Sequence, residues 1–229
     1  MNFSNYKNIN KILLIRLSSI GDVLLTSPLI RLLRKKFPNS QIDFAVSASF
    51  SELLENNPHI SNIFHYDKSK QHKDIEQGRN SFLGGLNVDK YDVVIDLQMN
   101  LRSIHFRNGL SDNILRFRKD RLNKLSLVYL KKSIHKETVL IPDRYINTAK
   151  SLDLEDDGLG LEFWLPRDRV AGKYVPFDRE PPDKIETITI APGAHHFTKR
   201  WLPERFAELI DRLNDKYDAR IMLLGGKGD

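Results

Sequence analysis

The stretch KILLIRLSSIGDVLLTSP (residues 11–28) decides the fold. Its first part, KILLIR (11–16), is a short apolar run, typical of a strand that is buried on both faces of a parallel sheet. SSIGD then favours a turn. Apolar residues recur at helical spacing from Val23 to Phe37, and FPNS ends the helix that this spacing predicts. QIDFAV (41–46) predicts a second strand, so the chain opens with a β-α-β unit.

The same alternation continues along the chain. We predict strands at Asn62–His65 and in YDVVID (91–96), with helices around Phe50–Glu55 and before Val88. Repeated strand–helix alternation indicates a doubly wound α/β domain with a parallel sheet. Ligands of such domains bind at the carboxyl ends of the strands, so the residues that follow each strand are candidates for a site.

Three other segments before residue 167 lack this clear alternation. The polar stretch Asp67–Arg79 is interpreted as a mobile surface loop. Residues 142–154 predict a helix and residues 160–166 an extended segment. Phe163 and Trp164, the aromatic residues of that segment, are expected in the core.

A second α/β unit is predicted after a stretch rich in Pro, Arg and Asp. It consists of IETITIAPG (185–193), an amphipathic helix from Pro203 to about Tyr217, and the strand RIMLLGG (220–226). The predicted organisation is therefore a first domain over 1–165, a linker over 166–184 and a second domain over 185–229. A single β-α-β unit is smaller than a stable domain, so we expect the second domain to be incomplete.

Composition narrows the class of protein. The chain has 229 residues, no cysteine and a formal net charge of +6, which excludes disulfides and thiolate metal sites. It shows neither a long apolar run nor a signal-peptide pattern, so we expect a cytoplasmic protein. Residues 101–145 contain eleven Lys and Arg against four Asp and Glu. This local excess indicates either a solvated basic face or an anionic partner with phosphate groups.

The turn after the first predicted strand holds Ser19, Gly21 and Asp22. Gly21 permits close backbone approach, and the serines and nearby amides can donate hydrogen bonds. Asp22 has two interpretations, as a first-turn acid that stabilises the helix or as a general base in an open cleft. The sequence lacks both G-x-G-x-x-G and G-x-x-x-x-G-K-[ST], so it does not match the usual NAD or P-loop patterns.

Four segments, in this order, resemble the lipopolysaccharide heptosyltransferase family of glycosyltransferases. They are RLSSIGDVLLTSP (16–28), DLQMNLRS (96–103), APGAHHFTKRWLPERFAELIDRL (191–213) and LLGGKGD (223–229). The resemblance implies a GT-B type fold, with a Rossmann-like acceptor domain followed here by the first β-α-β unit of a second Rossmann-like domain. It also implies inverting, metal-independent transfer of a heptose or related sugar from an ADP-sugar to the lipopolysaccharide inner core, without a cofactor.

The resemblance assigns roles to individual residues. Asp22 matches the family's proposed catalytic base, and Lys199 matches the lysine that meets the donor diphosphate. The other expected donor-binding residues are Thr198, Gly193, Gly21 and Ser19. The expected acceptor-binding residues are Arg102, Arg118, Lys119, Arg121, His135 and Arg144. For Arg102 the alternative is a salt bridge that anchors a helix, and for Lys199 it is an exposed position in a polar turn.

Other residues of the same segments are assigned to structure. His195 and His196 have no carboxylates at ligand spacing, so no metal site is expected there. Trp201 is interpreted as a packing residue beside the helix that follows it. An Asp-Ser-Gly…His segment, which the family uses to grip the nucleotide sugar, does not follow Asp229. We therefore expect an incomplete donor site and no measurable transfer by this chain alone.

The expected partners are an ADP-sugar, the lipopolysaccharide core and the inner surface of the cytoplasmic membrane, without nucleic acid. Two alternatives stay open. The chain can be a non-catalytic remnant that binds acidic glycolipid. It can also be a basic nucleic-acid-binding protein, although no helix-turn-helix, zinc or RNP pattern is present in the sequence.

Overall fold

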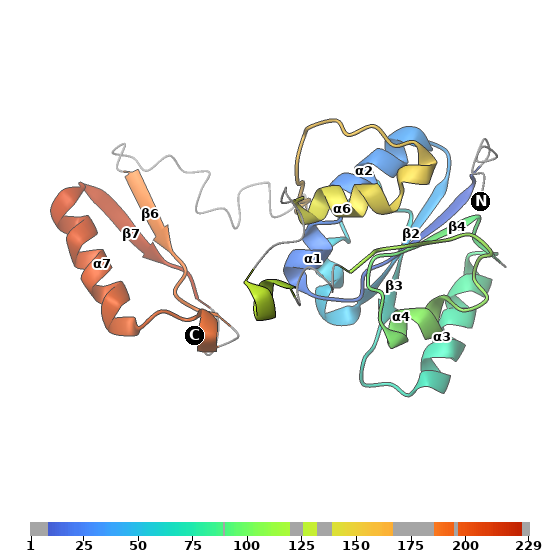
Figure 1. Ribbon diagram of the computed structural model, residues 1–229, viewed down its shortest axis with the longest axis horizontal. Helices are drawn as coiled ribbons and strands as arrows, with labels where there is room; N and C mark the ends of the chain where they lie inside the picture. The colour runs from blue at the N-terminus through green and yellow to red at the C-terminus, as the bar shows by residue number, and fades with distance from the viewer. Residues whose placement is uncertain are drawn as a thin grey trace. The chain divides into compact units, whose positions relative to one another are not determined.

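The computed structural model of the protein describes residues 9–88, 90–119, 126–131, 139–166, 186–194 and 197–225. The chain divides into two compact units, Met1–Leu165 and Pro166–Asp229 (Figure 1). Apart from Pro166, the predicted linker lies outside the described residues. Each unit is an α/β structure with parallel strands, as the sequence predicted.

The first unit contains a five-stranded parallel sheet within its described residues, in the order β3-β2-β1-β4-β5. The strands are β1 (Lys11–Ile15), β2 (Gln41–Ser47), β3 (Asn62–Tyr66), β4 (Val93–Asp96) and β5 (Ile114–Arg116). β1 lies in the middle, where Leu14 is level with Phe44 of β2 and Ile95 of β4. The chain order reverses between β1 and β4, which makes this the switch point of the sheet.

Helices cover both faces of this sheet. α2 (Ser27–Lys36) and α6 (Ile141–Thr148) lie on one face, and α3 (His72–Gly85) and α4 (Leu101–Arg107) lie on the other (Figure 1). Alternate residues of β1 therefore enter different cores, with Leu14 on the α2 side and Leu13 on the α3 side. This two-sided burial is the physical reason why KILLI is apolar without interruption.

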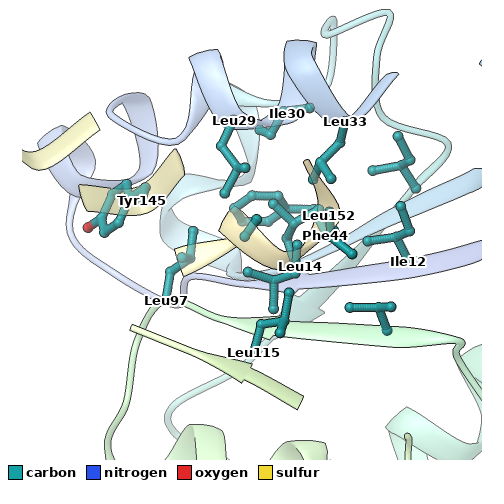
Figure 2. Packing of buried hydrophobic residues seen from close by; sticks show 14 of the residues in the cluster. Ile12, Leu14, Leu29, Ile30, Leu33, Phe44, Leu97, Leu115, Tyr145 and Leu152 are labelled. Atoms are coloured by element: carbon teal, nitrogen blue, oxygen red, sulfur yellow. The ribbon is translucent and has the colours of Figure 1, made fainter. Parts of the chain in front are cut away.

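The core on the α2 side is built from the apolar stripe of that helix. Figure 2 shows Leu29, Ile30 and Leu33 of α2 over Phe44 and Leu14 of the sheet. All five side chains are fully buried. Burying a side chain of this size stabilises the fold by about 1.5–3 kcal/mol.

The predicted helix Val23–Phe37 is in fact two helices. α1 (Ile20–Leu24) ends before Leu25, and α2 begins at Ser27. Pro28 lies in the first turn of α2 and has no N–H to continue a helix from α1, so the chain restarts there. The Thr26 hydroxyl donates to the carbonyl oxygen of Val23 at 2.6 Å and closes the last turn of α1.

The structure differs from the sequence predictions for this unit at four further places. Asp67–Arg79 is not a loop throughout, because α3 begins at His72 and buries Ile75 one turn later. The short strand β5 was not predicted. The 142–154 helix ends at Thr148 and is followed by a 3-10 turn over Lys150–Leu152. The region around Phe50–Glu55 forms a 3-10 helix over Ala48–Leu53.

Phe163 and Trp164 were predicted in the core, and they are 52% and 39% exposed. Their segment is tied to α2 by polar groups instead. Arg31 of α2 donates to both carboxylate oxygens of Asp157, at 2.9 and 2.7 Å, and to Glu162 at 3.1 Å. Glu162 thus points toward the helix, and its aromatic neighbours remain partly in solvent.

The second unit contains β6 (Glu186–Ile190), α7 (Pro203–Lys216) and β7 (Ala219–Leu223), as predicted. The two strands are parallel, with Ile188 level with Ile221. Trp201 packs edge-on against Phe206 at 5.1 Å between ring centroids, which fits its predicted packing role, although about half of its surface is exposed.

We predict that Asp157→Asn destabilises the first unit at pH 7 by about 1–3 kcal/mol, because Arg31 loses its charged partner. Hydrogen bonds from Arg31 lower the pKa of Asp157 from 3.8 to about 2. A group with a lowered pKa adds stability above its unfolded value and loses it as the pH falls toward the folded value. Urea unfolding should therefore show a gap between the two proteins at pH 7 that narrows between about pH 4 and 2.

Asp153→Asn is the control. Asp153 pairs with Lys36 at 3.2 Å but is almost completely exposed, so its loss should change the unfolding free energy little. Equal effects of the two substitutions would contradict a stabilising role for the Arg31 contacts.

Candidate active site

The loops that follow β1 and β4 meet at the switch point of the sheet. The Gln98 side-chain oxygen accepts hydrogen bonds from the backbone N–H groups of Leu17 and Ser18, at 3.0 and 3.3 Å. Arg16 donates from Nη1 to the carbonyl oxygen of Leu97 at 2.7 Å. The two loops therefore hold each other at the carboxyl edge, where ligands of doubly wound sheets bind.

Asp96, the last residue of β4, fixes the loop that carries Gln98. It is fully buried, and its Oδ1 accepts from the backbone N–H groups of Gln98 and Met99 at 3.0 and 2.9 Å. Its Oδ2 accepts from the Ser103 hydroxyl at 3.0 Å and lies 3.0 Å from Nε of Arg107. The buried anion is thus neutralised by Arg107, so Arg107 and not Arg102 anchors this helix.

Asp22 lies in the first turn of α1, directly beyond this junction. Its Oδ2 is 2.5 Å from Nη2 of Arg16 and accepts from the Ser19 N–H and hydroxyl at 3.3 and 3.1 Å. The hydrogen bond from the Ser19 N–H stabilises the start of the helix. This is the structural role that the sequence suggested for Asp22. Among the described residues Oδ1 has no partner, and the side chain is 36% exposed. Asp22 can therefore accept another hydrogen bond from solvent or a ligand.

The environment keeps Asp22 ionised. Partial burial acts to raise its pKa, but the positive charge and hydrogen bond of Arg16, with the two hydrogen bonds from Ser19, outweigh burial. The net result is a pKa below the ordinary value of 3.8. At neutral pH the group is a carboxylate that can receive a proton.

The predicted acceptor-binding residues that the structure describes lie after β4 and β5 or on α6. Arg102 is exposed in the first turn of α4, and Arg118 and Lys119 are exposed just after β5. Arg144 of α6 donates to the carbonyl oxygen of Arg118 at 2.8 Å and lies 4.9 Å from the centroid of the Phe117 ring. No acidic side chain of the described residues pairs with Arg102, Arg118 or Arg144, so their charges are available for an anion.

Tyr145 of α6 connects these cations to Asp22. Its buried ring lies 5.1 Å from that of Phe117 and 5.8 Å from the guanidinium of Arg16. Burial is the main reason that the pKa of Tyr145 is raised, so its hydroxyl stays neutral. Asp22, Arg16, Tyr145 and Arg144 therefore form one cluster. Arg121 and His135 lie outside the described residues, which leaves the predicted pairing of His135 with Arg144 open.

The predicted donor-binding residues fall in both units. Ser19 and Gly21 lie at the start of α1 and are exposed. Gly193 follows β6 at its carboxyl end, and Thr198 and Lys199 form a 3-10 turn that ends four residues before Pro203 of α7. Arg200 donates to the carbonyl oxygen of Ala194 at 2.6 Å and closes this loop. His195 and His196 lie outside the described residues.

Sequence reasoning did not select Arg16, Gln98 or Tyr145. The position of Arg16 directly after a fully apolar strand could have indicated its importance, because a charged residue that is buried there must find a partner. Within the described parts of the chain, no group of three or more His, Cys, Asp or Glu side chains is placed to hold a metal ion. No helix among the same residues is long and apolar enough to cross a membrane.

Comparison with known proteins shows which family the chain is similar to. The family model "Glycosyltransferase family 9 (heptosyltransferase)" matches residues 79–229. The curated Lipopolysaccharide heptosyltransferase 3 of Escherichia coli is 34% identical over 79 residues, which cover 34% of this chain and 23% of that protein.

Solved structures show the same fold. A glycosyl transferase family 9 structure from Veillonella parvula has a TM-score of 0.72 and 24% identity, with 99% of this chain and 64% of that chain covered. E. coli heptosyltransferase WaaC with ADP gives 0.64 and 22%, covering 95% and 68%. E. coli ADP-heptose lps heptosyltransferase II gives 0.60 and 20%, covering 96% and 65%. The predicted GT-B fold class is thereby confirmed.

Proposed function

Since the chain belongs to glycosyltransferase family 9, we propose that it forms the acceptor side and part of the donor side of a heptosyltransferase. This enzyme transfers a heptose, or a related sugar, from an ADP-sugar to the inner core of lipopolysaccharide. Residues 1–165 bind the acceptor, 166–184 connect the domains, and 185–229 contribute to the donor side. The observation that carries the proposal is the ionised, partly exposed Asp22 at the switch point of the sheet.

Asp22 supplies the general base in this proposal. A sugar hydroxyl is a weak nucleophile, and a carboxylate within hydrogen-bond distance can remove its proton as the new glycosidic bond forms. Oδ1 of Asp22 accepts that proton because Oδ2 is already held by Arg16 and Ser19. One direct attack by the hydroxyl on the anomeric carbon inverts its configuration.

Cations around Asp22 supply the recognition of the acceptor. Arg102, Arg118, Lys119 and Arg144 lie after the strands or on α6, and inner-core acceptors carry phosphate and carboxylate groups. Arginine binds both kinds of group through paired N–H donors. Arg121 and His135 belong to the same proposed set.

The second unit supplies the stabilisation of the leaving group. ADP gains negative charge on its β-phosphate as the bond to the sugar breaks, and a cation there stabilises that charge. Lys199 takes this role, because it lies in the turn before α7, whose N-terminus also favours anions. Thr198 and Gly193, with Ser19 and Gly21 of the first unit, complete the proposed donor-binding residues. The scheme requires neither a metal ion nor a cofactor.

The basic segment offers a surface for the membrane that holds the acceptor. Residues 116–136 contain eight Lys and Arg and one Asp. Within it, Val128, Tyr129 and Leu130 of the turn Ser126–Leu130 are strongly exposed. Cations attract anionic headgroups, and tyrosine with aliphatic neighbours favours the interface. We propose that the turn Ser126–Leu130, with the Lys and Arg residues near it in sequence, contacts the inner surface of the cytoplasmic membrane.

Asp22→Asn should reduce kcat of the complete enzyme by about two to four orders of magnitude, because the amide cannot accept the proton. The amide oxygen can still accept from the Ser19 N–H. The assay is release of ADP from ADP-heptose that depends on a lipopolysaccharide acceptor. The buried Arg16 loses its ion pair in this variant, so unfolding must be measured beside turnover.

Asp157→Asn provides the matched control for this experiment. Asp157 also pairs with a buried arginine of the first unit, so its loss reduces stability in a similar way without touching the base. Turnover per folded molecule should stay normal in this variant. Near-normal turnover of Asp22→Asn would show that Asp22 only stabilises its helix.

Lys199→Ala should weaken ADP binding by about tenfold or more, since it removes a charge-assisted contact with the diphosphate. Titration calorimetry with ADP measures this. Lys216→Ala, which removes an exposed cation at the other end of α7, should leave the affinity unchanged. Equal ADP affinity in the wild type and Lys199→Ala would contradict the assigned role.

Replacing Val128, Tyr129 and Leu130 by serine should reduce binding to vesicles with anionic lipid by about tenfold or more, since burying even one such side chain is worth about 1.5–3 kcal/mol. Flotation with phosphatidylglycerol-containing vesicles measures it. Serines at Leu159, Leu161 and Phe163, which are exposed beside acidic residues, are the control. Unchanged flotation of the first variant would exclude this membrane contact.

A further inference from the structure

We propose that Arg16 is the positioning residue of the reaction, which holds one oxygen of Asp22 so that the other is directed to the acceptor hydroxyl. The inference rests on the proposed function, in which Asp22 is the base. Arg16 itself touches neither substrate in this scheme. It acts through the orientation and the ionisation of Asp22.

The guanidinium of Arg16 is fixed from two sides. Nη1 donates to the carbonyl oxygen of Leu97 at 2.7 Å, and Nη2 lies 2.5 Å from Oδ2 of Asp22. The side chain is nine-tenths buried, and the Tyr145 ring lies 5.8 Å from the guanidinium carbon. Because a guanidinium group is planar and rigid, the bond to the β4 loop sets the direction in which Nη2 points.

The carboxylate of Asp22 is fixed in turn. Arg16 and the two donors of Ser19 all meet Oδ2. A carboxylate is planar too, so three donors on one oxygen define where the second oxygen lies. Among the described residues Oδ1 is left without a partner, which makes it the proton-accepting atom. The series of contacts from the β4 loop through Leu97 and Arg16 thus sets the position of Oδ1 of Asp22.

Arg16 is also the cation that keeps the base ionised. Among the described residues, the ionisable groups that act on Asp22 are Arg16 after β1 and Tyr145 of α6, and Arg144 of α6 acts on Tyr145. The pKa of Tyr145 is raised, first by burial, so this phenol adds no competing negative charge. Arg16 supplies the largest effect that opposes the burial of Asp22. A lysine at this position keeps the charge but lacks the paired nitrogens that fix its direction.

The first test uses this chain and needs no turnover. The ¹³C signal of the Asp22 carboxyl, assigned by its loss in Asp22→Asn, is followed from pH 7 downward in the folded protein. In the wild type its midpoint should lie below the ordinary value of 3.8. In Arg16→Gln the midpoint should move to higher pH than in the wild type, because the largest effect that opposes burial is lost and only the two hydrogen bonds from Ser19 remain to lower the pKa of Asp22.

Arg31→Gln is the matched control. Arg31 is an equally buried arginine that pairs with acids in the same unit, so its loss disturbs the fold without approaching Asp22. The Asp22 signal should titrate as in the wild type. Identical titration in wild type and Arg16→Gln, or equal shifts in both variants, would overturn the proposal.

The second test is kinetic and uses the complete enzyme. Arg16→Gln should lower kcat by about ten- to a hundredfold, the cost of a misplaced catalytic group, with little change in the KM for the acceptor. Arg16→Lys should restore the ionisation of Asp22 but only part of kcat. Arg31→Gln should keep kcat per folded molecule. Unchanged kcat in Arg16→Gln, or the same loss in Arg31→Gln, would refute the positioning role.

The two proposals fail in different ways. If Asp22→Asn retains turnover, the base assignment is wrong, and the positioning role falls with it even if Arg16 shifts the titration of Asp22. If Asp22→Asn abolishes turnover while Arg16→Gln changes neither titration nor kcat, the base assignment stands and only the positioning role is lost.

Discussion

The central position of β1 constrains the rest of the first unit. Its residues Lys11–Ile15 are hydrogen-bonded to β2 on one side and β4 on the other, and helices cover both faces. In β1 the apolar run ends at Ile15, and in the parallel neighbour β4 it ends at Ile95, before Asp96. Because the two strands are neighbours and run in the same direction, their carboxyl ends lie at one edge of the sheet, and the polar loops that follow them meet there.

Two buried arginines show how similar ion pairs can have different consequences. Arg31 is neutralised by Asp157, which is only 9% exposed, so the pair is closed to solvent and connects α2 with the end of the unit. Arg16 is as buried as Arg31, but its partner Asp22 is 36% exposed. In both cases the acid removes the cost of an isolated buried charge. Only the second acid remains accessible to a reacting molecule.

The sequence predicted each described strand except β5, the parallel sheet and the second β-α-β unit, because uninterrupted apolar runs and helical spacing depend on burial alone. It did not predict the break at Leu25, since apolar spacing continues through it and only Pro28 marks the new helix. The start of α3 was missed because its first turn is polar and Ile75 is its first buried residue. The partners of charged residues were even harder to predict from the sequence. Arg102 and Arg107 both follow β4, and only the fold shows that Arg107 reaches Asp96.

In the proposed reaction, with Asp22 as the base and an ADP-sugar as the donor, the lowered pKa of Asp22 raises a question about its strength as a base, since a carboxylate stabilised by Arg16 accepts a proton less readily. The timing of glycosyl transfer resolves it. When the bond to the departing ADP is largely broken, the anomeric centre is positive, and a hydroxyl that bonds to it becomes strongly acidic. Proton removal then requires little base strength but an ionised oxygen in the correct place. In the proposed mechanism the Arg16 contact reduces the base strength of Asp22, which a late proton transfer tolerates, and supplies the ionisation and orientation that such a transfer requires.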